Sequence, residues 1–366
     1  MRRELIIHIG DPKTGSTSIQ KALASGIVQS PNAEIFYPAP LNHNGIAKSL
    51  MLKPVPLRPF PQVLKQMAKK RKFASCARKI KHSSAEINII SGENFCDVPP
   101  QTLKASIEKH FDSTRFNVRI IAYVRPHASR ILSSYVEQIK VGYFSGTLEG
   151  FHQKFLKNRK IFYHARFQKW REVFGPAFTL RPFVRKELLE GCVVTDFLNY
   201  ALQGKPFSLA KELSENSSLS LEDLMVIMEI QKLLPLEEPE LRHAIGYGFD
   251  RILQNSPPAS NGRKLVLHDD LAMKIRETYT NDAMATDETF FSGKPILQQA
   301  LVAQTDDCSI EAQSILPGDY LSETELRRLR MVSQLLSDTA GHQPAATARH
   351  LRNIWGDVRS PRSLKQ

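Results

Sequence analysis

One stretch indicates the fold of the N-terminal part of this 366-residue chain: His8-Ile9-Gly10-Asp11-Pro12-Lys13-Thr14-Gly15-Ser16-Thr17-Ser18. It begins within the short apolar run of residues 4–9, whose β-branched side chains are typical of a buried strand that stops at Gly10. We expect a helix over residues 19–27, with Ser16, Thr17 or Ser18 as its N-cap. Strand, glycine-containing loop and helix together form a junction whose backbone N–H groups can hold an anion.

The same alternation continues downstream of this junction. We predict strands over residues 87–90 and 116–124 and helices over residues 99–110 and 128–140. Strands that alternate with helices indicate a parallel sheet with crossover helices, and such sheets bind ligands beyond the carboxyl ends of their strands. Because Lys13, Glu93 and Arg125 each follow a strand, we expect them to converge at one edge of the sheet.

The later part of the chain has a coarser pattern. We predict helices over residues 163–174, 193–202 and 220–234 and a strand over residues 178–183. Residues 35–85 contain no Asp or Glu; we expect the proline-containing part to be irregular and the basic part, residues 65–81, to be a helix. We place one domain over residues 1–300, with a helical or irregular C-terminal extension over residues 301–366 that ends in a poorly tied tail.

The composition excludes several classes of protein. Hydrophobic residues make up 42% and charged residues 24%, which excludes wholesale disorder. No apolar run approaches the roughly 18–20 residues of a membrane span. The four cysteines (Cys76, Cys96, Cys192, Cys308) lie far apart, so neither a disulfide framework nor a zinc cluster is expected. With no secretory signal at the N-terminus, these features favour the cytoplasm. The net charge of +13 favours anionic partners without choosing among them.

The spacing of Gly10 and Gly15 is that of a nucleotide-phosphate loop, G-x-x-x-x-G. A Walker motif has a lysine directly after the second glycine, whereas Ser16 stands there and the lysine, Lys13, lies inside the loop. An NTPase with this loop would lack its principal contact to the β- and γ-phosphates. The capacity of the loop to bind an anion remains.

The loop resembles the 5′-phosphosulfate loop of sulfotransferases that use 3′-phosphoadenosine 5′-phosphosulfate (PAPS). The pattern of that family, Pro-Lys-(Thr/Ser/Ala)-Gly-(Thr/Ser)-(Ser/Thr), is matched at every position from Pro12 to Thr17. The resemblance implies that PAPS is bound through Lys13, Thr14, Gly15, Ser16, Thr17 and Ser18. It also implies a catalytic role for Lys13, which would stabilise the departing oxygen.

A second signature of these sulfotransferases binds the 3′-phosphate of PAPS. It consists of an Arg at a strand end and a Ser eight residues later, which Arg125 and Ser133 match, followed by the family's Ser-x-Tyr pattern at Tyr135. The family often has Pro two residues after the Arg, whereas Pro126 follows Arg125 directly. A planar guanidinium and a hydroxyl suit the oxygens of a phosphate.

Two residues compete for the role of general base. In related glycan and tyrosyl-protein sulfotransferases a Glu in the region of Ile89–Phe95 takes the proton of the acceptor hydroxyl, which implies Glu93. The rival is His43, within Leu41–Gly45, because related bacterial sequences commonly have a His there; it could instead bind the acceptor. The sequence leaves the choice open.

The resemblance implies a bacterial carbohydrate-type sulfotransferase with a P-loop-NTPase-like three-layer sandwich, a central parallel β-sheet flanked by helices. Such a transferase moves the sulfuryl group of PAPS to a hydroxyl of a carbohydrate or glycolipid, an acidic one included, and releases 3′,5′-ADP without a metal. We expect no nucleic-acid partner and no membrane span; peripheral membrane contact and the oligomeric state stay open. The alternatives are a P-loop kinase or NTPase, a basic nucleic-acid-binding protein, and a degenerate fold that binds nucleotide without turnover.

Overall fold

A computed structural model describes residues 2–52, 71–210, 219–234, 237–256, 262–341 and 343–354. The chain divides into two compact units. The sheet unit comprises residues 1–126, 162–213 and 281–300, and the helical unit comprises residues 127–161, 214–280 and 301–366. The boundary that the sequence suggests at residue 300 stays a prediction.

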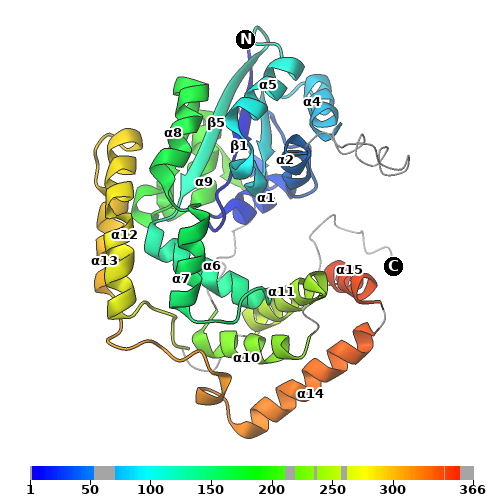
Figure 1. Ribbon diagram of the computed structural model, residues 1–366. Coiled ribbons are helices and arrows are strands. Elements are labelled where there is room, and N and C mark those ends of the chain that lie inside the picture. Colours follow the sequence, from blue (N-terminus) through cyan, green and yellow to red (C-terminus); the bar gives the residue numbers. More distant parts are fainter. Residues whose placement is uncertain are drawn as a thin grey trace. The chain divides into compact units, whose positions relative to one another are not determined.

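The sheet unit is built on five parallel strands (Figure 1). They are β1 (Arg3–His8), β3 (Ile35–Phe36), β4 (Ile87–Ser91), β5 (Phe116–Val124) and β6 (Phe178–Pro182). Their order in the sheet is β3-β4-β1-β5-β6, so β1 lies between β4 and β5. The loop that follows β1 therefore emerges between the loops that follow β4 and β5.

Helices cover both faces of this sheet. On one face, α1 (Ser16–Ala24) and α9 (Val193–Leu202) bury a hydrophobic cluster that includes Ile6, Ile121 and Phe197. On the other face, α5 (Pro100–His110) lies beside α8 (Tyr163–Phe174), whose Phe167 and Trp170 stack on Phe178 of β6. These three layers, with a parallel sheet in the middle and a glycine-containing loop after β1, confirm the predicted fold class.

Most of the predicted elements that carry strong periodicity are confirmed. The strand over 116–124 and the helices over 163–174 and 193–202 have the predicted bounds. Helix α10 (Leu221–Lys232) begins after Ser220, whose side chain accepts the N–H of Asp223 at 3.0 Å. A hydroxyl there satisfies an amide that has no acceptor within the helix.

Three predictions about local structure are wrong. The first helix begins at Ser16 and ends at Ala24, because Gly15, in the left-handed region with φ +75°, serves as its N-cap in place of a hydroxyl. The described part of the proline-containing segment is only partly irregular: residues 37–43, which include Pro38 and Pro40, lack helix and strand, but β3 and α2 (Asn44–Leu50) flank them. The last strand stops at Pro182, one residue early. The basic helix α4 spans Lys72–His82, and residues 65–70 lie outside the described residues.

The helical unit contains α6, α7, α10, α11, α14 and α15, while α12 and α13 have residues in both units. The bounds not yet given are α6 (His127–Lys140), α7 (Leu148–Asn158), α11 (Pro239–Asn255), α12 (Asp269–Phe290), α13 (Ile296–Asp306), α14 (Glu323–Ala340) and α15 (Pro344–Ile354). Helix α14 pairs with α10 and α15 with α11 around a core that includes Ile230, Leu241 and Ala348. The predicted tail, residues 355–366, lies outside the described residues. None of the described helices is both long enough and apolar enough to span a bilayer.

Candidate active site

The Lys13 loop, residues 9–15, connects β1 to α1 in the sheet unit. Lys13 has φ +66° and Gly15 has φ +75°, so two left-handed residues flank Thr14. Left-handed residues in a loop turn successive N–H groups toward one side, which creates a concave site for an anion. The amides of Ser16 and Thr17 add to this site, because helical amides of the first turn have no acceptor within their own helix. The next amide, Ser18 N–H, donates to the Gly15 carbonyl at 3.0 Å.

Two glycines leave this loop the space it needs. A Cβ on Gly10 would lie 2.3 Å from Ser16 Oγ, and a Cβ on Gly15 would lie 2.7 Å from Val193 Cγ1. Both distances are too short for real atoms, and Gly15 also has the positive φ that residues with a Cβ rarely adopt. The loop is therefore packed tightly underneath, with its backbone as the surface that a ligand can approach.

The hydroxyls of the loop do not all point the same way. Thr14 is buried and its Oγ1 donates to the carbonyl of Asp11 at 2.6 Å. Ser16 is buried as well; its Oγ lies against Gly10 and has no hydrogen-bond partner among the described residues. Thr17 is exposed and Ser18 is half-buried. Thr14 and Ser16 therefore contribute their backbone to the site, while the open hydroxyls belong to Thr17 and Ser18.

Arg125 follows β5 and contacts the Lys13 loop. Its Nη1 donates to the carbonyl of Lys13 at 3.3 Å, and its guanidinium carbon lies 5.8 Å from the ring centre of Phe183. Its own carbonyl accepts the hydroxyl of Tyr163 at 2.6 Å. Arg125 and Lys13, 112 residues apart in the sequence, are thus brought together as expected. Ser133 lies half-buried on α6, in the helical unit.

An ion pair that the sequence did not reveal joins the loop to α8. Arg166 Nη1 lies 2.7 Å from Asp11 Oδ1, and the guanidinium lies over the ring of Phe167. Burial alone would lower the pKa of Arg166, but the charge of Asp11 and the hydrogen bond to it raise that pKa above its ordinary value. The sequence predicts the helix α8 from its periodicity, but it does not indicate which carboxylate forms an ion pair with Arg166.

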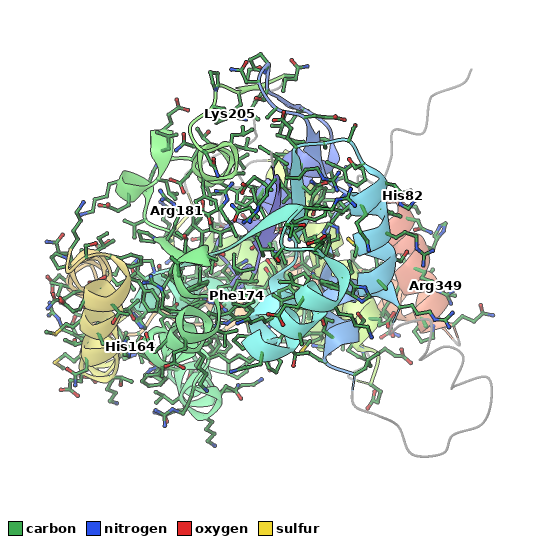
Figure 2. The ribbon with its side chains drawn as sticks, turned by 90° about the horizontal axis from the view of Figure 1, so that it is seen from above. His82, His164, Phe174, Arg181, Lys205 and Arg349 are labelled. Carbon is green, nitrogen blue, oxygen red and sulfur yellow. The ribbon has the colours of Figure 1, made fainter. Side chains whose placement is uncertain are left out.

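Helix α8 is fixed by a residue from far along the chain. His164 and Phe174 mark its two ends in Figure 2. At its N-terminus, the carboxylate of Asp282 accepts the N–H of Tyr163 at 2.7 Å and that of His164 at 3.1 Å. A carboxylate at this end satisfies two first-turn amides and interacts favourably with the helix dipole. The helix that supplies Arg166 and Tyr163 to the site is therefore held in place by α12.

The Glu93 loop, residues 91–94, follows β4 and leads into the 3-10 helix η1 (Glu93–Asp97). The start of α2 binds this loop through neutral hydrogen bonds. His43 N–H donates to Ser91 O at 2.8 Å, and Asn44 Oδ1 accepts the N–H of Asn94 at 3.1 Å. The structure thus brings the segments of both predicted bases, His43 and Glu93, together beside the end of β4.

The contacts of His43 indicate which ring nitrogen carries the proton. Ser91 N–H, which can only donate, lies 3.1 Å from His43 Nδ1. Ser91 O lies 3.3 Å from the same atom, but it already accepts the backbone N–H of His43 at 2.8 Å. Because buried amides are almost always paired, we infer that Nδ1 accepts the Ser91 N–H. The neutral ring then carries its proton on Nε2, which is buried and has no hydrogen-bond partner among the described residues. Burial, at 3% exposure, lowers the pKa of His43 to about 4.

A second buried histidine lies at the end of β1. His8 is fully buried, and its Nδ1 lies 2.8 Å from Ser91 Oγ, which also accepts the side-chain amide of Gln20 at 3.2 Å. Burial lowers the pKa of His8 to about 3, so the ring is neutral at ordinary pH. His8 and Gln20 therefore link β1 and α1 to the first residue of the Glu93 loop without adding charge.

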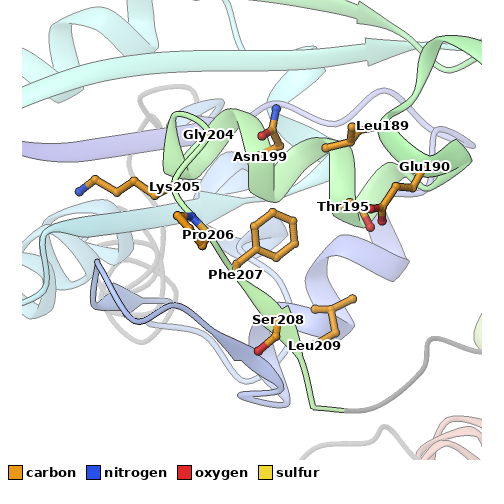
Figure 3. A pocket seen from close by; sticks show the side chains of 10 residues that line it. All are labelled: Leu189, Glu190, Thr195, Asn199, Gly204, Lys205, Pro206, Phe207, Ser208 and Leu209. Carbon is orange, nitrogen blue, oxygen red and sulfur yellow. The ribbon is translucent and has the colours of Figure 1, made fainter.

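A hollow elsewhere on the sheet unit contains none of the predicted site residues. It has a volume of about 420 Å³ and is lined by α9, by Leu189 and Glu190 just before that helix, and by residues 204–209 after it (Figure 3). Lys205, Phe207 and Glu190 are among the side chains around it (Figure 3). In the part of the chain that the structure describes, no three or more His, Cys, Asp or Glu side chains are grouped to hold a metal ion.

Comparisons with known proteins add little to this picture. Neither the models of known protein families nor the curated proteins give a match to the sequence. Among solved structures, a sulfotransferase from Alicyclobacillus acidocaldarius is similar at 12% sequence identity and a TM-score of 0.41. The match covers 81% of this chain and 99% of that one. A functional assignment therefore has to rest on the residues of this chain.

Proposed function

We propose that this protein is a sulfotransferase that moves the sulfuryl group of PAPS to a hydroxyl of a carbohydrate or glycolipid acceptor. The observation that carries the proposal is the Lys13 loop. Two left-handed residues and the start of α1 direct amides into one concave site, and the Lys13 carbonyl is held by Arg125. The residues present fit a 5′-phosphosulfate, because amides, a lysine and open hydroxyls are the donors that such an anion needs.

Each group in the site has a proposed role. Lys13 stabilises the oxygen that gains negative charge as the bond to sulfur breaks. The amides from Thr14 to Thr17, with the hydroxyls of Thr17 and Ser18, hold the 5′-phosphate. Arg125 holds the 3′-phosphate, the group that distinguishes PAPS from ATP. The assignment of Ser133 to the same phosphate stays a prediction from the resemblance.

Glu93 is the better candidate for the general base. Because Nδ1 of His43 accepts the Ser91 amide, the neutral ring has no lone pair left for the proton of an acceptor hydroxyl. Glu93 is half-buried, follows β4, and belongs to a loop that is fastened on both sides. A carboxylate at the end of a strand can take the proton of an acceptor hydroxyl.

The surface beside the Glu93 loop favours an acidic acceptor. Exposed cations stand along α4 at Lys72, Arg78, Lys79 and Lys81. Lys72 Nζ lies 3.0 Å from where a Cβ on Gly45 would be, and Gly45 directly follows Asn44, which binds the Glu93 loop. A carboxylate, phosphate or sulfate group on the acceptor would therefore meet Lys72 near the proposed base.

Calorimetric titration with 3′,5′-ADP, ADP and ATP tests the nucleotide half of the proposal. We expect 3′,5′-ADP to bind about 10- to 100-fold more tightly than ADP, because a phosphate held by charged hydrogen bonds contributes on that scale. Lys13→Ala and Arg125→Ala should weaken binding, whereas Lys205→Ala, a lysine beside the hollow of Figure 3, should not. ATP binding as tightly as 3′,5′-ADP would contradict the proposal and favour a kinase.

Transfer of radioactive sulfuryl groups from PAPS to paired neutral and acidic glycans tests the catalytic half. Lys13→Ala should lower the transfer rate by about 10²- to 10³-fold, as expected for loss of a group that stabilises developing charge. Glu93→Gln should lower the rate by about 10²-fold or more and leave 3′,5′-ADP binding intact. A Glu93→Gln enzyme with full activity would rule out the assigned base.

A further inference from the structure

A negative charge lies inside the loop that we assign to anion binding. Asp11 is two residues from Lys13 and 1% exposed. Like charges repel strongly where water is excluded, so an uncompensated carboxylate at this position would oppose a phosphate or sulfate in the same loop. The loop therefore needs a cation that neutralises Asp11.

Arg166 supplies that cation. Its Nη1 lies 2.7 Å from Asp11 Oδ1, with the Arg166 side chain 20% exposed and that of Asp11 2% exposed. An arginine is always protonated, and a buried pair of this kind is screened little by salt. The guanidinium comes from α8, whose N-terminus is held by Asp282, so its position is set by the sheet unit itself.

Asp11 also controls the backbone of the loop. Its carboxylate is held by α8, while its carbonyl accepts the hydroxyl of Thr14 at 2.6 Å. Lys13 lies between these two anchored residues in the left-handed region, with φ +66°. This conformation is unfavourable for a residue with a Cβ and persists only where its surroundings enforce it.

We propose that Arg166 is a positioning residue of the nucleotide site: through Asp11 it cancels the charge of the Lys13 loop and holds Lys13 in its left-handed conformation. The inference rests on the proposed function only in treating the Lys13 loop as an anion site. It applies to any nucleotide that presents a phosphate or phosphosulfate to that loop.

A double-mutant cycle separates this role from plain structural support. Arg166→Gln removes the guanidinium that pairs with the buried Asp11 carboxylate, and we expect the affinity for 3′,5′-ADP to fall by about 100-fold. Asp11→Asn combined with Arg166→Gln removes both charges, and affinity should return to within about 10-fold of the wild type. Urea unfolding of the same variants is measured beside affinity, because removing both partners of a buried pair can also restore stability. A purely structural role predicts normal affinity in the folded fraction of Arg166→Gln, whereas the positioning role predicts weak binding by the folded protein.

Two single variants keep the test decisive if Arg166→Gln fails to fold. Arg166→Lys retains the cation but offers no planar fork, so affinity should fall by about 5- to 10-fold. Asp11→Asn removes the negative charge and keeps a side chain of the same shape, so affinity should stay equal or rise by about 3-fold. Arg171→Gln is the matched control: this arginine is on the same helix, over the ring of Phe290, and should leave affinity unchanged.

The outcomes distinguish this inference from the proposed function. A double variant as weak as Arg166→Gln, or an Asp11→Asn variant weakened by about 10-fold or more, would overturn the inference. If the wild type prefers ATP, the sulfotransferase proposal fails, and the same rank order of variants measured with ATP still supports the role of Arg166. If folded wild type binds none of 3′,5′-ADP, ATP and pyrophosphate, both proposals fail.

Discussion

The Lys13 loop and the Glu93 loop follow neighbouring strands, β1 and β4, yet the protein holds them by different means. Charged groups hold the first: Arg166 pairs with Asp11, and Arg125 binds the Lys13 carbonyl. Neutral groups hold the second, through the backbone and ring of His43 and the side chain of Asn44. The comparison shows two ways of fixing neighbouring loops: charged side chains bind the Lys13 loop, whereas His43 and Asn44 bind the residues on either side of Glu93 through neutral hydrogen bonds.

The largest effect is expected where the tight packing of the Lys13 loop is broken. Gly15→Ala places a Cβ at φ +75° and 2.7 Å from Val193. We therefore expect the free energy of unfolding to fall by about 2–4 kcal/mol and 3′,5′-ADP binding to be lost. Gly26→Ala has a similar φ of +70° but open space around the new Cβ. It should cost only about 1–2 kcal/mol and leave nucleotide binding unchanged.

Thermal or urea unfolding of the two variants, with titration of 3′,5′-ADP, measures this difference. Adding Val193→Ala to Gly15→Ala should recover the part of the loss that comes from overpacking, but not the part that comes from φ. Equal losses of stability for Gly15→Ala and Gly26→Ala would mean that the packing below the loop does not contribute to stability.

Acid should act first on the buried neutral histidines, His43 and His8, which contact Ser91 of the Glu93 loop. Burial lowers the pKa of His43 to about 4 and that of His8 to about 3, whereas the same groups in the unfolded chain titrate near 6.5. Between pH 6.5 and about 4 the unfolded chain therefore binds more protons, and the free energy of unfolding falls as the pH falls. The slope is about 1.4 kcal/mol per pH unit for each of these histidines.

Urea unfolding at pH 7, 6 and 5 checks this prediction. His43→Asn keeps an oxygen that can accept the Ser91 amide but does not titrate in this range. Below pH 6.5 its stability should fall less steeply than that of the wild type, by about 1.4 kcal/mol per pH unit. Parallel curves for the two proteins would show that His43 is not held neutral by burial.

The smallest effect is expected from one hydrogen bond of the Glu93 loop. Asn44→Ala removes the acceptor of the Asn94 N–H, which should cost about 1 kcal/mol and speed the exchange of that amide by about 5- to 10-fold. Asn44→Asp keeps an oxygen at the same place and should restore protection. Hydrogen exchange measures both, and affinity for 3′,5′-ADP should stay within about 2-fold.

Asn117→Ala serves as the control for this loop. Asn117 is exposed on β5, and its side chain donates to Glu4. Its removal should leave exchange at Asn94 unchanged. Faster exchange at Asn94 in both variants would indicate general loosening of the sheet and not a specific contact by Asn44.

The sequence predicted what depends on local pattern. The strand over 116–124 and the helices over 163–174 and 193–202 follow from periodicity, and the grouping of Lys13 and Arg125 follows from the rule that parallel strands end at one edge. The predicted start of α1 is three residues too late, because Ser16, Thr17 and Ser18 are all good N-cap residues. Only the backbone conformation shows that Gly15 is the N-cap.

Other parts of the site depend on contacts that no local pattern encodes. Arg166 meets Asp11 across 155 residues, and Asn44 binds the amide of Asn94 across 50. A seven-residue helix in a proline-containing segment, α2, forms because it docks on η1, whereas its own residues are indifferent helix formers. Tertiary packing decides such elements, and the sequence alone does not specify which partner is present.

The capping of α8 by Asp282 has a consequence for how the protein is made. Residues of the Lys13 loop leave the ribosome first, but the helix that braces them gains its cap only after roughly 270 more residues have been added. At about 5–20 residues per second that interval lasts about 15 to 50 s. A nascent chain would therefore carry the Lys13 loop without this brace until Asp282 has been made, a period in which chaperones would have to protect it.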